Sequence, residues 1–177
     1  MKRGMVVAAM GLALYARPGV GGSYWTTFFP AVTVLGLGMA IVVAPLTTTV
    51  MAAVEAQHAG VASGVNNAVA RVAGLMAIAL FGILLVRTFE ARVSPALDDL
   101  GLAATERTAI DRELPKLAGV EIPSAIQLPQ RVAARRTIDV SFVSAFRVVM
   151  MAAAAVALVA AIAGALIRNT MTPSPNS

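Results

Sequence analysis

Few residues of this 177-residue chain could carry out chemistry. Cysteine is absent and His58 is the single histidine, which excludes thiol nucleophiles, disulfides and any site that needs two histidines. A serine nucleophile at Ser63 would need a glycine two residues before it and a histidine base in another apolar stretch, and the sequence has neither. A nucleotide-binding loop, paired carboxylates within an apolar stretch and a metal-ligand cluster are also lacking. We therefore expect no enzyme and no catalytic, cofactor or metal site.

The polar residues that interrupt the apolar stretches are the remaining candidates. Arg71 is the only ionisable residue well inside one of these stretches. A charge there costs about 2.5–3.5 kcal/mol, so it should be paired or close to an interface. Asn67 lies one helical turn before Arg71 on the same face and could accept a hydrogen bond from it. Two interpretations stay open: Arg71, Asn66 and Asn67 anchor the end of a helix, or they act in gating or in contact with an anion.

A second candidate group lies around Pro45. Proline removes one backbone hydrogen bond from a helix, so we expect a bend there. Thr48 and its two threonine neighbours could bind the carbonyl that the bend frees. A moving helix beside a cavity and a fixed bend fit the residues equally well. The candidate cavity or gating residues are thus Pro45, Thr48, Asn66, Asn67 and Arg71.

The elements that must position these residues are membrane helices. Hydrophobic residues make up 58% of the chain and charged residues 13%, about half the charge of an ordinary soluble domain. The basic residues bracket apolar runs and do not form a polar face, so we expect no nucleic-acid partner. A helix needs about 20 apolar residues to cross a bilayer. Four stretches approach that length: 4–20, 27–54, 63–86 and 142–167. The first reaches it only if the helix continues past Arg17.

The stretch between the last two apolar runs is different, because it holds eight of the nine acidic residues. It must lie in water. Ser94 and Pro95 are typical of the start of a helix, and residues 105–114 could form another short one. We interpret the segment as a charged loop with short helices; a lid over a substrate path is the alternative. The organisation expected is three transmembrane helices in 1–87, a polar segment over 88–141, a last transmembrane helix over 142–168 and a disordered tail over 169–177.

Small residues repeat at a spacing of four within the spans, which lets helices approach closely. The expected packing pairs are Gly36 with Ala40 and Ala70 with Gly74, followed by an alanine series in the last span. Tyr24 and Trp25 lie where a helix would meet the headgroup layer. A cleaved secretory signal in the first apolar run is a weaker alternative, because Leu14 occupies a position that prefers a small residue.

The run from Gly36 to Leu85 resembles the late part of a major facilitator superfamily transporter of the fourteen-span drug:proton antiporter family. The matching positions are Gly36-Leu37-Gly38, Pro45, Gly60, Ser63-Gly64, Asn66, Arg71 and Gly74. The polar segment and the alanine-rich final stretch also resemble the end of that family. The resemblance implies an all-α membrane protein whose four transmembrane helices correspond to the last four spans of the family fold. It also implies a plasma (inner) membrane location, both termini in the cytoplasm and an extracytoplasmic polar segment, an orientation that the charge distribution alone leaves open.

The resemblance further implies that the full transporter exchanges protons for hydrophobic or cationic amphipathic compounds. Its amino-terminal half, which carries the coupling acidic residue in the family, is not present in this sequence. We therefore expect the carboxy-terminal part of a multidrug efflux transporter, inactive alone, whose partners are the lipid bilayer and the remaining transporter helices. A different class of protein, a free-standing small membrane protein that acts as an assembly or regulatory partner, is the alternative.

Overall fold

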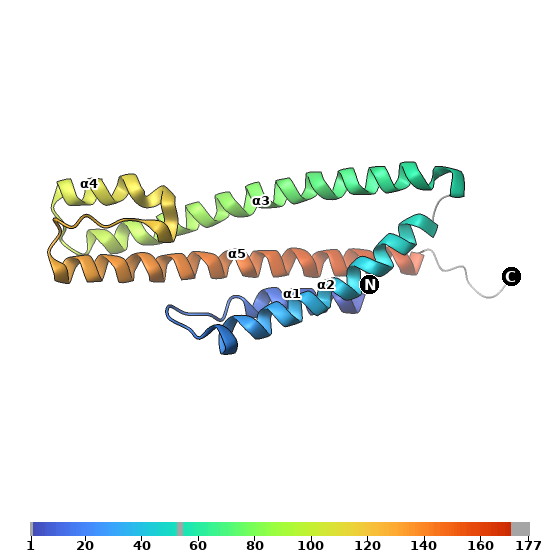
Figure 1. Ribbon diagram of the computed structural model, residues 1–177, viewed down its shortest axis with the longest axis horizontal. Coiled ribbons are helices and arrows are strands. Elements are labelled where there is room, and N and C mark those ends of the chain that lie inside the picture. Colours follow the sequence, from blue (N-terminus) through green and yellow to red (C-terminus); the bar gives the residue numbers. More distant parts are fainter. Residues whose placement is uncertain (1, 53–54, 171–177) are drawn as a thin grey trace. The chain divides into compact units, whose positions relative to one another are not determined.

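The computed structural model describes residues 2–52 and 55–170, and within these residues every regular element is a helix (Figure 1). The chain is an all-α membrane protein. Its elements in order are α1 (Lys2–Leu14), the π turn η1 (Tyr24–Phe28), α2 (Phe29–Ala52), the 3-10 turn η2 (Ala56–His58), α3 (Ala59–Asp98), α4 (Ala104–Glu113), the 3-10 turn η3 (Leu114–Gly119) and α5 (Leu128–Thr170).

Three of the described helices are long and apolar enough to cross a membrane, in the ranges Tyr24–Val43, Ala59–Asp98 and Leu128–Gly164. The 13-residue α1 is about 20 Å long at 1.5 Å per residue, which is shorter than the hydrocarbon core of about 30 Å. A fourth span at the start of the chain therefore stays a prediction. By contrast, α3 has 40 residues and α5 has 43, so each extends for about twice the bilayer thickness.

The chain divides into two units, and α3 and α5 each contribute to both. The first unit consists of residues 1–17, 23–78 and 150–177. Within it, α1 packs closely on α2 through glycines. A methyl group added to Gly11 would lie 2.6 Å from the backbone of Leu35, and one added to Gly38 would collide with the backbone of Ala8. Gly36, one of the small residues expected to allow close helix packing, faces open space within this chain.

The second unit contains residues 18–22 and 79–149. We call its residues 79–149 the cap. A buried apolar core holds the end of α3, α4, the following turn and the start of α5 together. The buried residues of α3 and of α5 recur four or seven residues apart, which is a helical period. The core residues are Phe89, Val93, Leu97, Ile110, Leu114, Val120, Ile126, Ala134, Ile138 and Ala145.

Arginine side chains on the surface of the cap form hydrogen bonds with backbone carbonyls of other elements and ion pairs with aspartates. Arg135 donates hydrogen bonds to the carbonyl oxygens of Val120 at 3.2 Å and Ala118 at 2.9 Å, and it forms an ion pair with Asp139 at 2.9 Å. These bonds connect the end of η3 and the residue after it to α5. Arg107 of α4 likewise donates to the Ser94 carbonyl of α3 at 3.3 Å and pairs with Asp98 at 3.1 Å. The polar segment is therefore a folded unit with its own core.

The helix ends in this region differ from those expected. Pro95 lies inside α3, whereas the sequence predicted the start of a new helix at Ser94 and Pro95. Leu97, two residues after the proline, is fully buried, so core packing continues through this last turn of α3. The short helix expected over 105–114 is present as α4, and residues 130–139, a basic stretch that contains Arg131, Arg135 and Arg136, belong to the first part of α5. Residues 171–177 of the expected tail lie outside the described residues.

Candidate functional site: the polar residues of the membrane helices

The five candidate residues lie on two helices of the first unit. Pro45 and Thr48 belong to α2, while Asn66, Asn67 and Arg71 belong to the first half of α3. α2 continues through Pro45, whose side chain lies outside the described part of the structure, so the bend there stays a prediction. None of the five lines the two grooves of the cap, around Ala96 and around Ala104, or the pocket around Leu14. The candidates thus lie on α2 and α3, two long helices that follow one another in the chain.

Arg71 is exposed on α3 and forms no hydrogen bond or ion pair with any described residue. The bond from Arg71 to Asn67 that the sequence allowed is not formed. Arg87 is the next charged residue, 16 positions later, which corresponds to about 24 Å along the helix. If Arg87 marks one edge of a hydrocarbon layer about 30 Å thick, Arg71 lies a few ångströms inside the other edge. A guanidinium can reach the headgroups from that depth.

The surface around Arg71 is apolar and uncovered. No side chain in the most apolar window of α3 is buried, and Leu75, one turn after Arg71, is 68% exposed. Asn66, on the other side of the helix, is half-buried. An exposed apolar surface of this length is stable only against lipid or against other apolar helices. The first half of α3 must therefore be surrounded by one or both of these.

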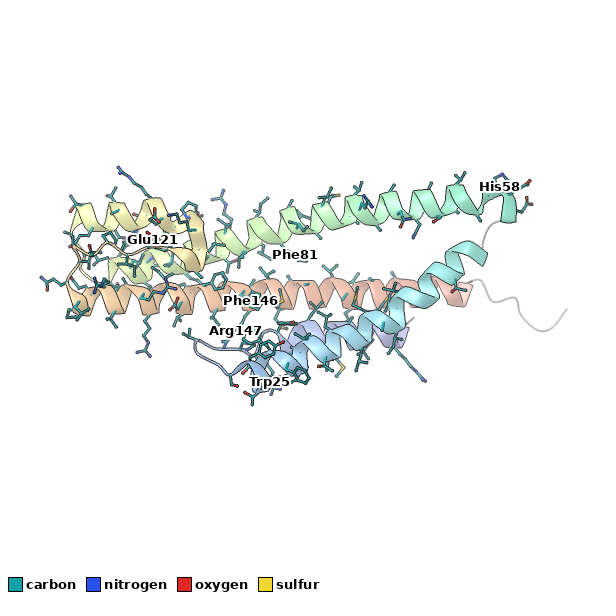
Figure 2. All side chains as sticks on the ribbon, viewed as in Figure 1. Trp25, His58, Phe81, Glu121, Phe146 and Arg147 are labelled. Carbon is teal, nitrogen blue, oxygen red and sulfur yellow. The ribbon has the colours of Figure 1, made fainter. Side chains whose placement is uncertain are left out.

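Aromatic and arginine residues next to the apolar stretches were only partly found from the sequence. Tyr24 and Trp25 were expected at headgroup depth, and in the structure they pack edge to face with ring centroids 5.7 Å apart. Arg147 was not singled out, yet its guanidinium donates two hydrogen bonds to the Pro18 carbonyl at 3.0 and 3.3 Å. The signal in the sequence was its position directly before the uncharged block that starts at Val148. Figure 2 labels Trp25 and Arg147.

The core of the cap was also missed. Phe89, Val93 and Leu97 lie four residues apart in a stretch that we interpreted as a charged loop, and this spacing was the available signal. Phe89 also packs edge to face on Phe142 of α5, with ring centroids 6.5 Å apart. Close by in the sequence, Arg92 donates to the Ser144 hydroxyl at 2.5 Å. The second half of α3 and the first half of α5 are thus joined by apolar and polar contacts alike.

Comparison with known proteins gives one informative similarity. Over 125 residues, covering 64% of this chain, the sequence is 31% identical to a protein of Streptomyces coelicolor described as a probable actinorhodin transporter. The chain spans 22% of the length of that relative. No protein-family model and no solved structure matches the chain. The similarity and the long apolar helices together support a role in transport across a membrane.

Proposed function

We propose that this chain is the carboxy-terminal part of a proton-coupled multidrug efflux transporter of the major facilitator superfamily, in its fourteen-span drug:proton antiporter family. The observation that carries the proposal is the similarity to a transporter of which the chain spans 22%. The transported compounds are hydrophobic or cationic amphipathic molecules. The protein lies in the plasma membrane with both termini in the cytoplasm, α1 completes a fourth span together with the turn that follows it, and the cap lies outside. No enzymatic step is part of this activity.

The uncovered half of α3 supports this proposal. Secondary transporters bind substrate near the bilayer midplane at the interface of two repeats and rock one repeat against the other. A chain with three or four spans has no second repeat, so it cannot alternate access by itself. The apolar surface around Arg71 and Leu75 is where the remaining transporter helices contact α3. The polar residues of that half then face protein or a cavity, as polar atoms within a membrane must.

Transport assays on vesicles test the proposal. The DNA upstream of Met1 is first translated, and we expect it to encode further hydrophobic spans. Vesicles that contain this chain alone should show no proton-driven dye efflux, whereas vesicles that contain the chain together with those spans should show it. Robust efflux by the chain alone, or an unrelated upstream sequence, would contradict the proposal. The second result would point to a free-standing membrane protein instead.

Arg71 provides a residue-level test in the assembled transporter. Polar contacts between membrane helices contribute about 1–2 kcal/mol, so Arg71→Ala should lower efflux by about tenfold. Arg112→Ala is the matched control, because Arg112 is an exposed residue of α4 in the cap. Arg92 is a poorer control because of its bond to Ser144. Equal effects of Arg71→Ala and Arg112→Ala would remove Arg71 from the transport path.

A further inference from the structure

A groove of about 320 Å³ lies between the second half of α3 and the first half of α5 in the cap. Pockets for small ligands have volumes of about 300–1,000 Å³, so this groove is large enough for a small organic molecule. One lining residue comes from α3 and the other five come from α5. The lining residues are Ala96, Ala133, Arg136, Thr137, Val140 and Ser141.

Polar contacts join the two helices on both sides of Ala96. Four residues before Ala96, Arg92 donates a hydrogen bond to the Ser144 hydroxyl at 2.5 Å. Four residues after Ala96, the carbonyl oxygen of Leu100 accepts a hydrogen bond from the Gln130 side chain at 3.4 Å. Between these contacts the alanines of the lining leave space that longer side chains would fill. The groove is therefore part of the folded cap.

The hydroxyl groups that line the groove have no partner among the described residues. Ser141 is 6% exposed, and its hydroxyl forms no hydrogen bond with any residue that the structure describes. The Thr137 hydroxyl, four residues earlier on α5, forms none with the described residues either. Buried polar groups are normally hydrogen-bonded. A nearly buried hydroxyl that lines a groove therefore favours an occupant that supplies the bond.

Arg136 adds a positive charge to the groove. It is exposed and forms no ion pair with a described residue. Asp139, three residues later on α5, pairs with Arg135 at 2.9 Å instead. A cation, two hydroxyl groups and apolar walls thus meet here, and none of the described residues that line the groove is acidic. This set of groups favours an anion that is joined to an apolar body.

The groove is distant from the uncharged block of α5. Arg136 is twelve positions before Val148, where that block starts, which corresponds to about 18 Å along the helix. The headgroup layer on each side of a bilayer is only about 5–8 Å thick. If α5 enters the hydrocarbon near Val148, the groove lies beyond the headgroups. Its distance therefore favours a molecule dissolved in water over a lipid.

We propose that this groove binds a small amphipathic carboxylate from the aqueous phase. The Arg136 guanidinium pairs with the carboxylate, the two hydroxyl groups donate hydrogen bonds to it, and the apolar body lies against the alanines and Val140. A second copy of the chain is a poorer occupant, because a symmetric dimer would bring the same arginine to the same face. Binding here does not depend on transport, since all lining residues lie in the cap.

Nuclear magnetic resonance of alanine methyl groups tests this site. The full chain with methyl-labelled alanine is placed in phosphatidylcholine nanodiscs; the probe is naphthoate, and naphthamide is its neutral analogue. We expect naphthoate to shift the methyl signals of Ala96 and Ala133 and to leave that of Ala109, in the other groove of the cap, unchanged. Naphthamide should bind about tenfold more weakly, because it lacks the charge that pairs with Arg136.

Three variants separate the groups of the site. Arg136→Gln should weaken naphthoate binding by about tenfold, to the level of naphthamide. Ser141→Ala should weaken it by about twofold to tenfold for one lost hydrogen bond. Arg131→Gln is the matched control, because it makes the same change on α5 at a residue that does not line the groove, and it should leave binding unchanged. Hydrogen exchange of α4 amides checks the folding of the cap; if Arg136→Gln opens the cap, Ser141→Ala decides.

Several outcomes would overturn the proposal. They are the absence of a shift at Ala96, equal binding of naphthoate and naphthamide, and equal losses in Arg131→Gln and Arg136→Gln. Shifts at Ala109 alone would assign the ligand to the other groove. Displacement of naphthoate by phosphatidylglycerol in the nanodisc would identify a lipid as the occupant. Loss of the shifts in the assembled transporter would mean that other parts of the transporter cover the groove. Each of these three results would overturn the proposal as well.

Discussion

The two halves of α3 share one helix and differ in what surrounds them. From Ala59 to Ile78 no apolar side chain is buried, whereas Phe89, Val93 and Leu97 in the second half are fully buried. Composition separates the halves too, because the first contains Arg71 as its only charged residue and the second contains several. The second half packs within this chain in the cap. The first half must be covered by lipid or by helices that the described chain does not supply. The proposed transporter would explain this difference between the two halves of α3.

Two leucines of α3 test that contrast most strongly. Leu97→Ala should lower the free energy of unfolding of the cap by about 2–5 kcal/mol, because it leaves a cavity in a closed core. Leu75→Ala, the same change on the exposed half, should change it by less than about 0.5 kcal/mol. Hydrogen exchange of α4 amides in detergent measures the opening of the cap.

The same two leucine variants also test the transport proposal when they are made in the assembled transporter. There, Leu75→Ala should become destabilising, because other helices would cover that surface. A cap that exchanges equally fast in Leu97→Ala and in the unchanged protein would mean that the core does not hold the cap together.

The helix pair of α1 and α2 is a second region that packs within this chain. Substitutions of its glycines should have the next largest effect on stability. Gly38→Ala should weaken the pairing by about 1–3 kcal/mol, because the added methyl group meets the backbone of Ala8 and neither helix can move without losing other contacts. Hydrogen exchange of α1 amides in detergent should rise accordingly. Gly36→Ala is the matched control, since it faces open space on the same helix. Equal exchange in the two variants would contradict the close approach at Gly38.

The packing of Gly36 and Gly38 shows how much of the structure could be predicted from the sequence. Hydropathy located the apolar helices, because length and composition alone decide whether a segment can cross a bilayer. The repeat of small residues predicted close packing, but it could not select Gly38 over Gly36, because the partner helix determines which face is used. The positions of Asn66, Asn67 and Arg71 on one helix were predicted correctly. Their surroundings could not be predicted, since Arg71 forms no hydrogen bond or ion pair with any described residue.

The cap shows a different limit. Its charges indicated an aqueous segment, and that location stays a prediction. Its core was missed because the buried residues come from three helices and two irregular turns, and each of these elements contributes only one to three apolar positions. Such short patterns are too weak to predict a fold until the tertiary contacts are known. The Arg135 bonds to the Val120 and Ala118 carbonyls are likewise determined by the path of the chain after η3.

The smallest expected effect is a pH dependence confined to the surface of the cap. The hydrogen bond from Lys116 to Glu113, at 2.5 Å, lowers the pKa of Glu113 below its usual value of 4.5. The same bond raises the pKa of Lys116 above 10.5. Because the carboxyl pKa is lower in the folded than in the unfolded state, the ionised carboxylate stabilises the fold at pH values above the unfolded-state pKa. This stabilisation is lost as the pH falls through the folded-state pKa. The protonated lysine, whose pKa is raised in the folded state, stabilises the fold at lower pH. This stabilisation is lost as the pH rises above 10.5 and through the folded-state pKa.

The ion pair is therefore complete between about pH 5 and pH 10. Lys116→Met should return the pKa of Glu113 toward 4.5, measured by the carboxyl carbon shift in an NMR titration. Because both side chains lie at the protein surface, the cap should stay folded in this variant, and hydrogen exchange in α4 should change far less than in Leu97→Ala. A cap that opens on acidification in the unchanged protein and no longer does so in Lys116→Met would show that this ion pair, and not the apolar core, holds α4 in place.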